Sequence, residues 1–231
     1  MSIQGDNSSV IVAGATGLIG GHVIEQLLAE PSVQTVYALT RSQIKREPTS
    51  SKLIQIINND LDITQWDEGH PRPTLGVICL GTTIKQVGSK AALRKVDVEL
   101  VTHVAQTMKF LGVERVAVVS SYGASPTSYS HYLKCKGQME QNLIRIGFKQ
   151  LFIARPGPLL GNRTKPRSDE KFLQTLSPLF KPFMIGRLKN LRPIESEWVA
   201  KTMLFKLFEN NFKNVEISSS SEMLKFLAKY R

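Results

Sequence analysis

The chain has 231 residues, 42% of them hydrophobic and 21% charged, which is enough for one domain with a full core and unlike a disordered protein. Its 30 Lys and Arg exceed its 19 Asp and Glu, giving a formal net charge of +11. Two cysteines provide neither a disulfide scaffold nor, by themselves, a metal centre, so we expect no metal. No apolar run reaches membrane-spanning length and the first residues lack a secretory pattern, so we expect a cytoplasmic protein.

Short apolar runs alternate with longer amphipathic segments through the first two-thirds of the chain. Six runs are predicted strands: residues 9–13, 33–40, 52–58, 74–80, 115–121 and 150–155. Three segments are predicted helices: residues 18–29, 91–111 and 129–147. Apolar strands separated by helices are typical of a parallel sheet covered on both faces. We therefore predict an α/β class, a doubly wound Rossmann-like parallel sheet with helices on both faces and a small irregular C-terminal cap.

The last third of the chain is irregular and rich in proline. We interpret residues 1–231 as one domain, with a dinucleotide-binding core over 1–160 and a dependent substrate-side cap over 161–231. The cap holds 14 basic and 7 acidic side chains. Its basic residues at the expected mouth of the site are Arg163, Lys165, Arg167, Arg187, Lys189 and Arg192. They favour an anionic substrate or partner, and a solvated surface explains them equally well.

Other partners are constrained by what the sequence lacks. The basic residues have no interleaved aromatic side chains and no nucleic-acid motif is present, so we expect no nucleic-acid partner. We also expect no stable membrane insertion. A homodimer is compatible with the sequence, which does not determine the oligomeric state.

A glycine-rich turn joins the first predicted strand to the first predicted helix. Its residues are Gly14, Ala15, Thr16, Gly17, Leu18, Ile19 and Gly20. Gly14 allows a tight turn, Gly17 lets the backbone approach a pyrophosphate, and Gly20 or Gly21 lets the helix pack against the strand. Free N–H groups at the start of the helix then bind the phosphates. This placement predicts a dinucleotide-binding site.

The end of the second strand indicates which dinucleotide is bound. An NAD site usually has an acidic residue there, whereas this chain has Arg41, followed by Lys45 and Arg46. A guanidinium suits a 2′-phosphate, so NADP(H) is favoured over NAD(H), with an ordinary surface arginine as the alternative. Asp60 and Leu61, after the third strand, would suit the adenine amino group, although an exposed loop acid explains Asp60 nearly as well.

A tyrosine and a lysine stand one helical turn apart, at Tyr132 and Lys136, on the helix that follows Ser120 and Ser121. Carbonyl reduction needs a proton donor, and a tyrosine of pKa ~10 serves only where a neighbouring ammonium favours its phenolate. We assign proton transfer to Tyr132, charge and ribose contact to Lys136, and the substrate oxygen to Ser121 or Ser120. The alternative is a packing tyrosine beside a solvated lysine.

With these motifs in order, the chain resembles the short-chain dehydrogenase/reductase superfamily. It is most similar to an atypical branch, the oxidoreductase-like Tat-interactive proteins and their bacterial relatives. The resemblance is carried by residues 14–20, 79–83, 120–136 and 155–160. It implies catalytic positions at Ser121, Tyr132 and Lys136. It also implies cofactor contacts at Arg41, Gly81, Thr82, Thr83, Pro156 and Gly157.

The leading hypothesis is an NADP(H)-dependent oxidoreductase that transfers a hydride between the nicotinamide and a small carbonyl or alcohol. An NADP(H)-binding regulatory or scaffold protein is the alternative, because the branch contains such proteins. A sugar-nucleotide epimerase or dehydratase is disfavoured, because the C-terminal part is short for a sugar-nucleotide pocket. The interval from Ser121 to Tyr132 is also shorter than in most active members, which leaves the choice of serine open.

Overall fold

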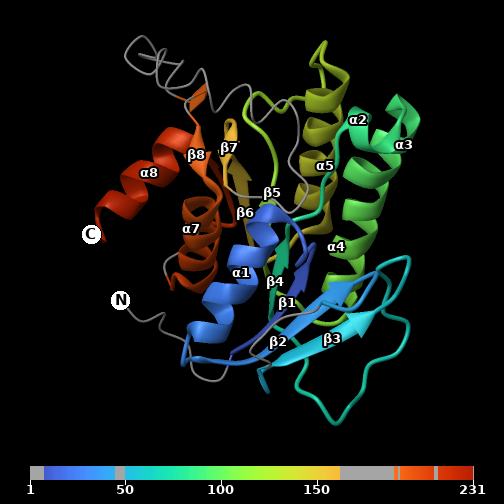
Figure 1. Cartoon of the computed structure of the whole chain (residues 1–231), viewed down its shortest axis with the longest axis vertical. Coiled ribbons are helices and arrows are strands. Elements are labelled where there is room, and N and C mark those ends of the chain that lie inside the picture. Colours follow the sequence, from blue (N-terminus) through green and yellow to red (C-terminus); the bar gives the residue numbers. More distant parts are fainter. Residues whose placement is uncertain (1–7, 45–49, 162–189, 192, 211–212, 231) are drawn as a thin grey trace.

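A seven-stranded parallel sheet forms the centre of the molecule (Figure 1). In this computed structural model the described residues are 8–44, 50–161, 190–191, 193–210 and 213–230. The strands, in their order across the sheet, are β3 (Leu53–Ile57), β2 (Val33–Thr40), β1 (Ser8–Ala13), β4 (Leu75–Ile78), β5 (Arg115–Val119), β6 (Gln150–Arg155) and β9 (Val215–Ser219). The doubly wound prediction is confirmed, with β1 near the centre and its neighbours on opposite sides.

Helices cover both faces of this sheet (Figure 1). One layer contains α1 (Leu18–Ala29), α7 (Ser196–Phe208) and α8 (Ser220–Ala228). The other contains α4 (Val101–Phe110) and α5 (His131–Ile146). Three short helices precede α4: α2 (Ile84–Val87), α3 (Lys90–Arg94) and a π-helical segment (Lys95–Leu100). A separate two-stranded sheet pairs β7 (Leu159–Leu160) with β8 (Ile194–Glu195).

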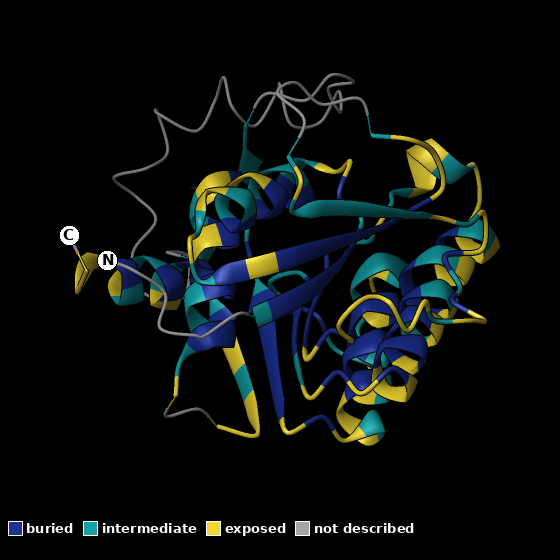
Figure 2. Cartoon of the chain, turned by 90° about the horizontal axis from the view of Figure 1, so that it is seen from below, coloured by how far each residue is buried: buried dark blue, intermediate teal, exposed yellow. Residues whose placement is uncertain are grey.

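Alternation along β1 explains the two cores. Val10 and Val12 point into the layer formed with α1 and α7, whereas Ile11 and Ala13 point into the layer formed with α4 and α5. Both sets are fully buried, and Figure 2 shows the dark blue central strands between partly exposed helices. A strand that is buried on both faces must be apolar throughout. This explains why the sequence of β1 is a continuous apolar run from Val10 to Ala13.

The C-terminal part contributes more to the fold than a cap. Its strand β9 pairs with β6 in parallel, and α7 packs against α1 through Val199, Met203 and Leu207, all fully buried. The sequence analysis missed β9 because it is an edge strand whose Val215 and Ile217 are 39% and 40% exposed, so it lacks a continuous buried run. The described residues of the C-terminal part thus complete the sheet through β9, and Leu191 contributes to the wall of the cavity described below.

The predicted helix over 91–111 is present but is not uniform. It contains α3, the π-helical segment and α4 in succession, where the sequence predicted one regular α-helix. Apolar spacing of three to four residues is compatible with both geometries, so the pattern could not distinguish them. The π-helical turn changes which side chain faces inward, and Asp97 is fully buried there.

Candidate functional site

The site lies at the carboxyl ends of the strands, where loops after β1, β4, β5 and β6 converge. A cavity of about 370 Å³ opens between these loops. Its described lining residues are Gly17, Leu18, Ile19, Cys79, Leu80, Gly81, Thr82, Val119, Ser120, Ser121, Tyr122, Tyr132, Lys136, Pro156, Gly157, Pro158, Leu159 and Leu191. The structure therefore brings most of the predicted turn, serine, tyrosine, lysine and proline-glycine positions together.

The glycine-rich turn has the geometry that an anion site requires. Gly14 has φ +87°, and a Cβ there would lie 2.7 Å from the backbone oxygen of Cys79. Gly17 caps α1 without a side-chain hydrogen bond, and the first turn of the helix contains no acidic residue. The N–H groups at this helix start are thus not capped by a side chain, and the positive end of the helix dipole faces the cavity mouth.

Gly20, and not its neighbour Gly21, is the close-packing glycine of α1. A Cβ on Gly20 would lie 2.0 Å from the Gly14 oxygen, whereas a Cβ on Gly21 would lie 4.0 Å from its nearest neighbour. We expect Gly20→Ala to lower the free energy of unfolding by about 1–3 kcal/mol through overpacking. Gly21→Ala should raise it by up to about 1 kcal/mol, since alanine is the better helix former. Urea unfolding of the two variants checks this, and equal effects would contradict it.

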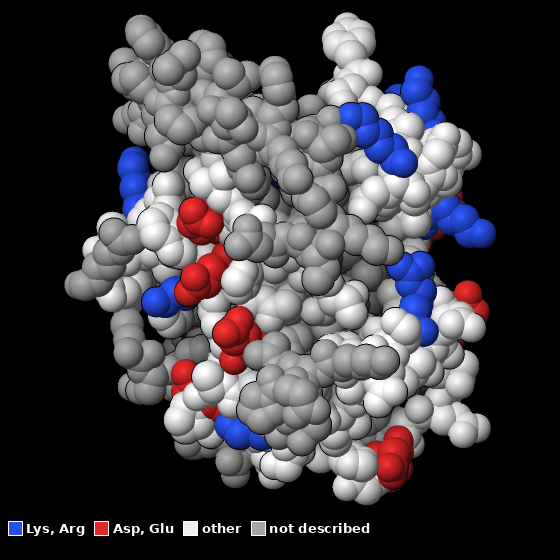
Figure 3. All heavy atoms as spheres, viewed as in Figure 1, with Lys and Arg blue, Asp and Glu red and all other residues white. Residues whose placement is uncertain are grey.

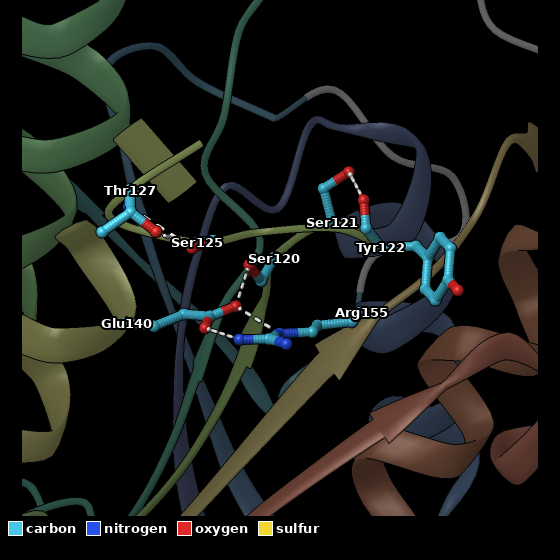
Figure 4. Close-up of polar contacts among 7 residues, drawn as sticks. All are labelled: Ser120, Ser121, Tyr122, Ser125, Thr127, Glu140 and Arg155. Carbon is cyan, nitrogen blue, oxygen red and sulfur yellow. Dashed lines mark hydrogen bonds and ion pairs between the residues drawn. The ribbon is translucent and has the colours of Figure 1, made fainter. Parts of the chain in front are cut away.

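Ser120 and Ser121, left open as alternatives, have different surroundings. Ser120 is buried and its Oγ donates to Glu140 Oε1 (Figure 4). Ser121 Oγ donates a long hydrogen bond, 3.4 Å, to the carbonyl oxygen of Tyr122. Both serines line the cavity, and the Ser120 hydroxyl is the one that already donates to a carboxylate.

Glu140 joins the ends of two strands and was missed by the sequence analysis. This buried residue of α5 accepts a hydrogen bond from Ser120 Oγ, at the end of β5 (Figure 4). It also accepts two hydrogen bonds from the Arg155 guanidinium at the end of β6, with Nε to Oε1 at 2.9 Å. The hydrogen bond to Glu140 raises the pKa of Arg155, so the arginine stays charged. Glu140 stands one turn after Lys136 on α5, a spacing that alone would have placed it near the site.

Tyr132 and Lys136 share one face of α5 and both line the cavity. The Lys136 ammonium lies 6.0 Å from the centroid of the Tyr132 ring. Lys136 is 3% exposed, and its Nζ is 2.5 Å from Oδ1 of Asp97. The solvated lysine considered as an alternative is therefore wrong, because this ammonium is buried and paired.

The segment between Ser121 and Tyr132 lies directly on α5. A Cβ on Gly137 would lie 2.2 Å from the backbone carbon of Ser125, so glycine is needed for this close approach. Ser125 N–H also donates to the carbonyl of Leu133 at 3.2 Å. These contacts fix the short segment against the helix that carries Tyr132.

Four of the predicted cofactor-binding residues do not line this cavity. Arg41 is exposed directly after β2, and Asp60 is exposed after β3. Leu61 is buried in the core with α4, with φ +55°, so its side chain serves packing. Thr83 is the residue before α2 and donates its hydroxyl to Gln86 at 3.4 Å. The structure does not bring these four residues into the wall of the cavity.

Several predicted basic positions fall outside the described residues. They are Lys45, Arg46, Arg163, Lys165, Arg167, Arg187, Lys189 and Arg192. On the face in Figure 3, Lys and Arg gather over the side where Figure 1 places α2 and α3, and acidic side chains gather nearer α1. Lys85, Lys90 and Arg94 are exposed on these helices, and Lys95 is exposed at the start of the π-helical segment. A basic surface thus follows the cavity loop at residues 79–83.

The described part of the chain contains neither a metal-ligand cluster nor a membrane-spanning helix. Among those residues, no three His, Cys, Asp or Glu side chains gather as metal ligands. None of the helices described there is long and apolar enough to cross a membrane. Cys79 lines the cavity, and burial raises the pKa of its thiol to about 12, so it is not a thiolate nucleophile at neutral pH.

Two family models match the sequence. The model described as HIM1 matches residues 73–187, and the model described as male sterility protein, an NAD-binding domain, matches residues 12–118. Together they cover the glycine-rich turn and the segment from Ser120 to Lys136. The matches agree with a Rossmann-type NAD(P)-binding fold.

Curated relatives come from yeasts and from filamentous fungi. "Protein FMP52, mitochondrial" of Saccharomyces cerevisiae is 35% identical over 160 residues, 68% of this chain and 68% of the relative. The protein of the same name from Kluyveromyces lactis is 29% identical over 222 residues, 94% of this chain and 97% of the relative. The cytoplasmic expectation is wrong by this comparison, because these relatives are named mitochondrial proteins. The absence of a secretory pattern does not distinguish the cytoplasm from a mitochondrial compartment.

Solved structures share the fold. WbmG of Bordetella bronchiseptica, in complex with NAD, has a TM-score of 0.64 at 15% identity and covers 97% of this chain and 79% of its own. The PhqB reductase domain of Penicillium fellutanum has a TM-score of 0.64 at 17% identity. The match covers 96% of this chain and 70% of the PhqB chain. At these identities the likeness shows the Rossmann-like fold alone. With the 35% identity to the Saccharomyces cerevisiae protein, it follows that the chain belongs to the FMP52 protein family.

Proposed function

We propose that this chain is an NADP(H)-dependent oxidoreductase that transfers a hydride between the nicotinamide and a small carbonyl or alcohol. The observation that carries the proposal is the gathering of the glycine-rich turn, Ser121, Tyr132 and Lys136 around one cavity. Proton donor, cation, hydroxyl and phosphate site are the groups that such a reaction requires. The motif pattern also supports kinship with the oxidoreductase-like Tat-interactive proteins, which we include in the proposal.

The residues present fit a dinucleotide. Gly17 brings its backbone to the cavity surface, and the start of α1 has neither a capping side chain nor an acid that would repel phosphate. Phosphates would be held by the N–H groups of this turn, and Lys136 would contact the ribose. Gly81, Thr82, Pro156 and Gly157 would line the nicotinamide end. When bound, the cofactor supplies or accepts the hydride.

The side chains of this protein would move the proton and orient the substrate. Tyr132 would donate a proton from its phenolic oxygen to the substrate oxygen, or take it back in the reverse direction. Ser121 would donate a hydrogen bond to the same oxygen. Ser120 has a different role in this proposal, because it anchors the end of β5 to Glu140.

Arg41 gives the proposal its preference for NADP(H). Its guanidinium, exposed after β2, would pair with the 2′-phosphate, and no acidic residue occupies this position for a ribose diol. We expect wild type to bind NADPH more tightly than NADH, and Arg41→Ala to weaken NADPH binding about 10-fold with little effect on NADH. Fluorescence titration with both cofactors measures this. Equal affinities in wild type would contradict the preference.

The decisive test of the proposed function is turnover of a panel of small aldehydes, ketones and alcohols, followed by absorbance of the reduced cofactor at 340 nm. A second candidate is an NADP(H)-binding regulatory protein without turnover. It is favoured by one observation: Asp97 compensates the charge of Lys136, which leaves less positive field to favour a Tyr132 phenolate. Cofactor binding without turnover of any panel member would support this candidate.

A further inference from the structure

A second cavity, of about 270 Å³, lies between α7 and α8 and shares no described lining residue with the first cavity. Figure 1 shows these two helices side by side near the C-terminus. Met223 and Leu227 of α8 are buried in the same core as Met203 of α7, so the helices are packed together at this core. The described wall of the second cavity consists of Trp198, Lys201, Phe205, Leu224, Leu227, Ala228 and Tyr230.

One face of α7 supplies the larger part of the aromatic wall. Trp198, Lys201 and Phe205 follow one another at intervals of three and four residues, which places them on the same face of the helix. Val199 and Met203 belong to the face that packs against α1 and are fully buried. The helix thus buries one face in the core and presents a mainly aromatic face to the second cavity.

The described wall combines three aromatic side chains with one charged side chain. The ring centroids of Phe205 and Tyr230 are 5.6 Å apart, with the ring planes inclined at 49°. The Lys201 ammonium lies 5.7 Å from the centroid of the Phe205 ring, and Lys201 is exposed. None of the carboxylates in the described part of the chain forms an ion pair with Lys201, so an anion at the cavity can pair with it.

We propose that this cavity binds a small aromatic carboxylate, whose ring packs among Trp198, Phe205 and Tyr230 while its carboxylate pairs with Lys201. Aromatic side chains accept a further ring in an offset-stacked or edge-to-face arrangement. A cationic ligand would be repelled by the ammonium. The volume is below the ~300–1,000 Å³ of sites for drug-sized ligands, which suits a ligand with a single ring. The proposal depends neither on the dinucleotide nor on turnover.

The fluorescence of Trp198 provides a direct measurement of binding. Trp66 is the only other tryptophan in the chain, so in a Trp66→Phe background the signal comes from the cavity wall alone. Phenylacetate is the probe, and phenylacetamide is its uncharged control of nearly the same shape. We expect phenylacetate to change the fluorescence saturably and phenylacetamide to bind about 5-fold more weakly, as for an exposed ion pair. Calorimetric titration of wild type with both compounds gives the dissociation constants independently of the Trp66 substitution.

Three variants locate the binding. Lys201→Gln should bind phenylacetate as weakly as phenylacetamide, because both ligands then lack an ionic partner. Lys90→Gln is the matched control: it removes the same charge from an exposed position on α3, away from the second cavity, and should keep the preference for phenylacetate. Ala228→Phe adds a ring to the wall from an exposed position and should abolish binding of both compounds.

The proposal is overturned if wild type binds neither compound saturably or binds both equally. Loss of the preference in Lys90→Gln would also overturn it, since net charge and not an ion pair at Lys201 would then explain the preference. A folded Ala228→Phe variant that still binds phenylacetate would place the compound elsewhere on the protein. Circular dichroism checks the fold of each variant, and Ala228→Leu replaces Ala228→Phe if the latter does not fold.

Discussion

Replacing Tyr132 with phenylalanine is expected to lower turnover of a carbonyl substrate by about 10²–10⁴-fold while leaving NADPH affinity within about 2-fold. The substitution removes only the phenolic oxygen that would transfer the proton. The ring keeps its packing against Leu93, Val98 and Cys135. Stopped-flow or steady-state measurement of cofactor oxidation, on a substrate found in the panel, gives the change in kcat.

Tyr129→Phe is the matched control for this prediction. Tyr129 lies three residues earlier, is fully exposed, and is absent from the described wall of the cavity. The Tyr129→Phe substitution removes the same phenolic oxygen, but at a position away from the cavity wall. Turnover by this variant should therefore equal that of wild type. If Tyr132→Phe retains full turnover, the proton comes from another group and the assigned role of Tyr132 is wrong.

Glu140→Ala is expected to lower the free energy of unfolding by about 3 kcal/mol. Removing one partner of a buried ion pair leaves the other uncompensated, a cost of roughly 3–5 kcal/mol. We expect a loss at the lower end of this range, because the Arg155 side chain is 28% exposed and water can partly compensate its charge. The Ser120 hydroxyl loses its acceptor as well. Urea denaturation monitored by circular dichroism measures the change.

Glu114→Ala provides the comparison. Glu114 pairs with Lys149 at 2.5 Å, but both side chains are substantially exposed, at 47% and 64%. Exposed pairs contribute only about 0–1 kcal/mol, so this variant should remain close to wild type. Similar losses in both variants would show that the Ser120–Glu140–Arg155 network has no special role in joining β5 and β6.

Much of the nucleotide-binding fold was predictable, because its central strands are buried on both faces. The runs at residues 9–13, 33–40 and 150–155 match β1, β2 and β6 within a residue. Apolar content and flanking turn residues are local properties, and here local and tertiary preferences agree. The glycine-rich turn was recognisable for the same reason, since its backbone requirements are local.

The parts of the site that escaped prediction depend on contacts between distant segments. The difference in surroundings between Ser120 and Ser121 depends on Glu140, which is 20 positions away from Ser120. Asp97 is a buried acid in a helical region whose apolar spacing looks regular, and it lies in a π-helical segment. No periodic pattern reports such a turn, so its pairing with Lys136 could be found only in three dimensions.

The late position of α7 and β9 in the sequence has a consequence for how the molecule is made. The inner face of α1, complete by residue 29, is covered by residues of α7 that follow about 170 positions later. Until those residues leave the ribosome, the apolar side chains of α1 and the free edge of β6 have no native cover, and both favour misassociation. The nucleotide-binding half of this protein therefore reaches its native state only after α7 and β9 have been synthesised and β9 pairs with β6.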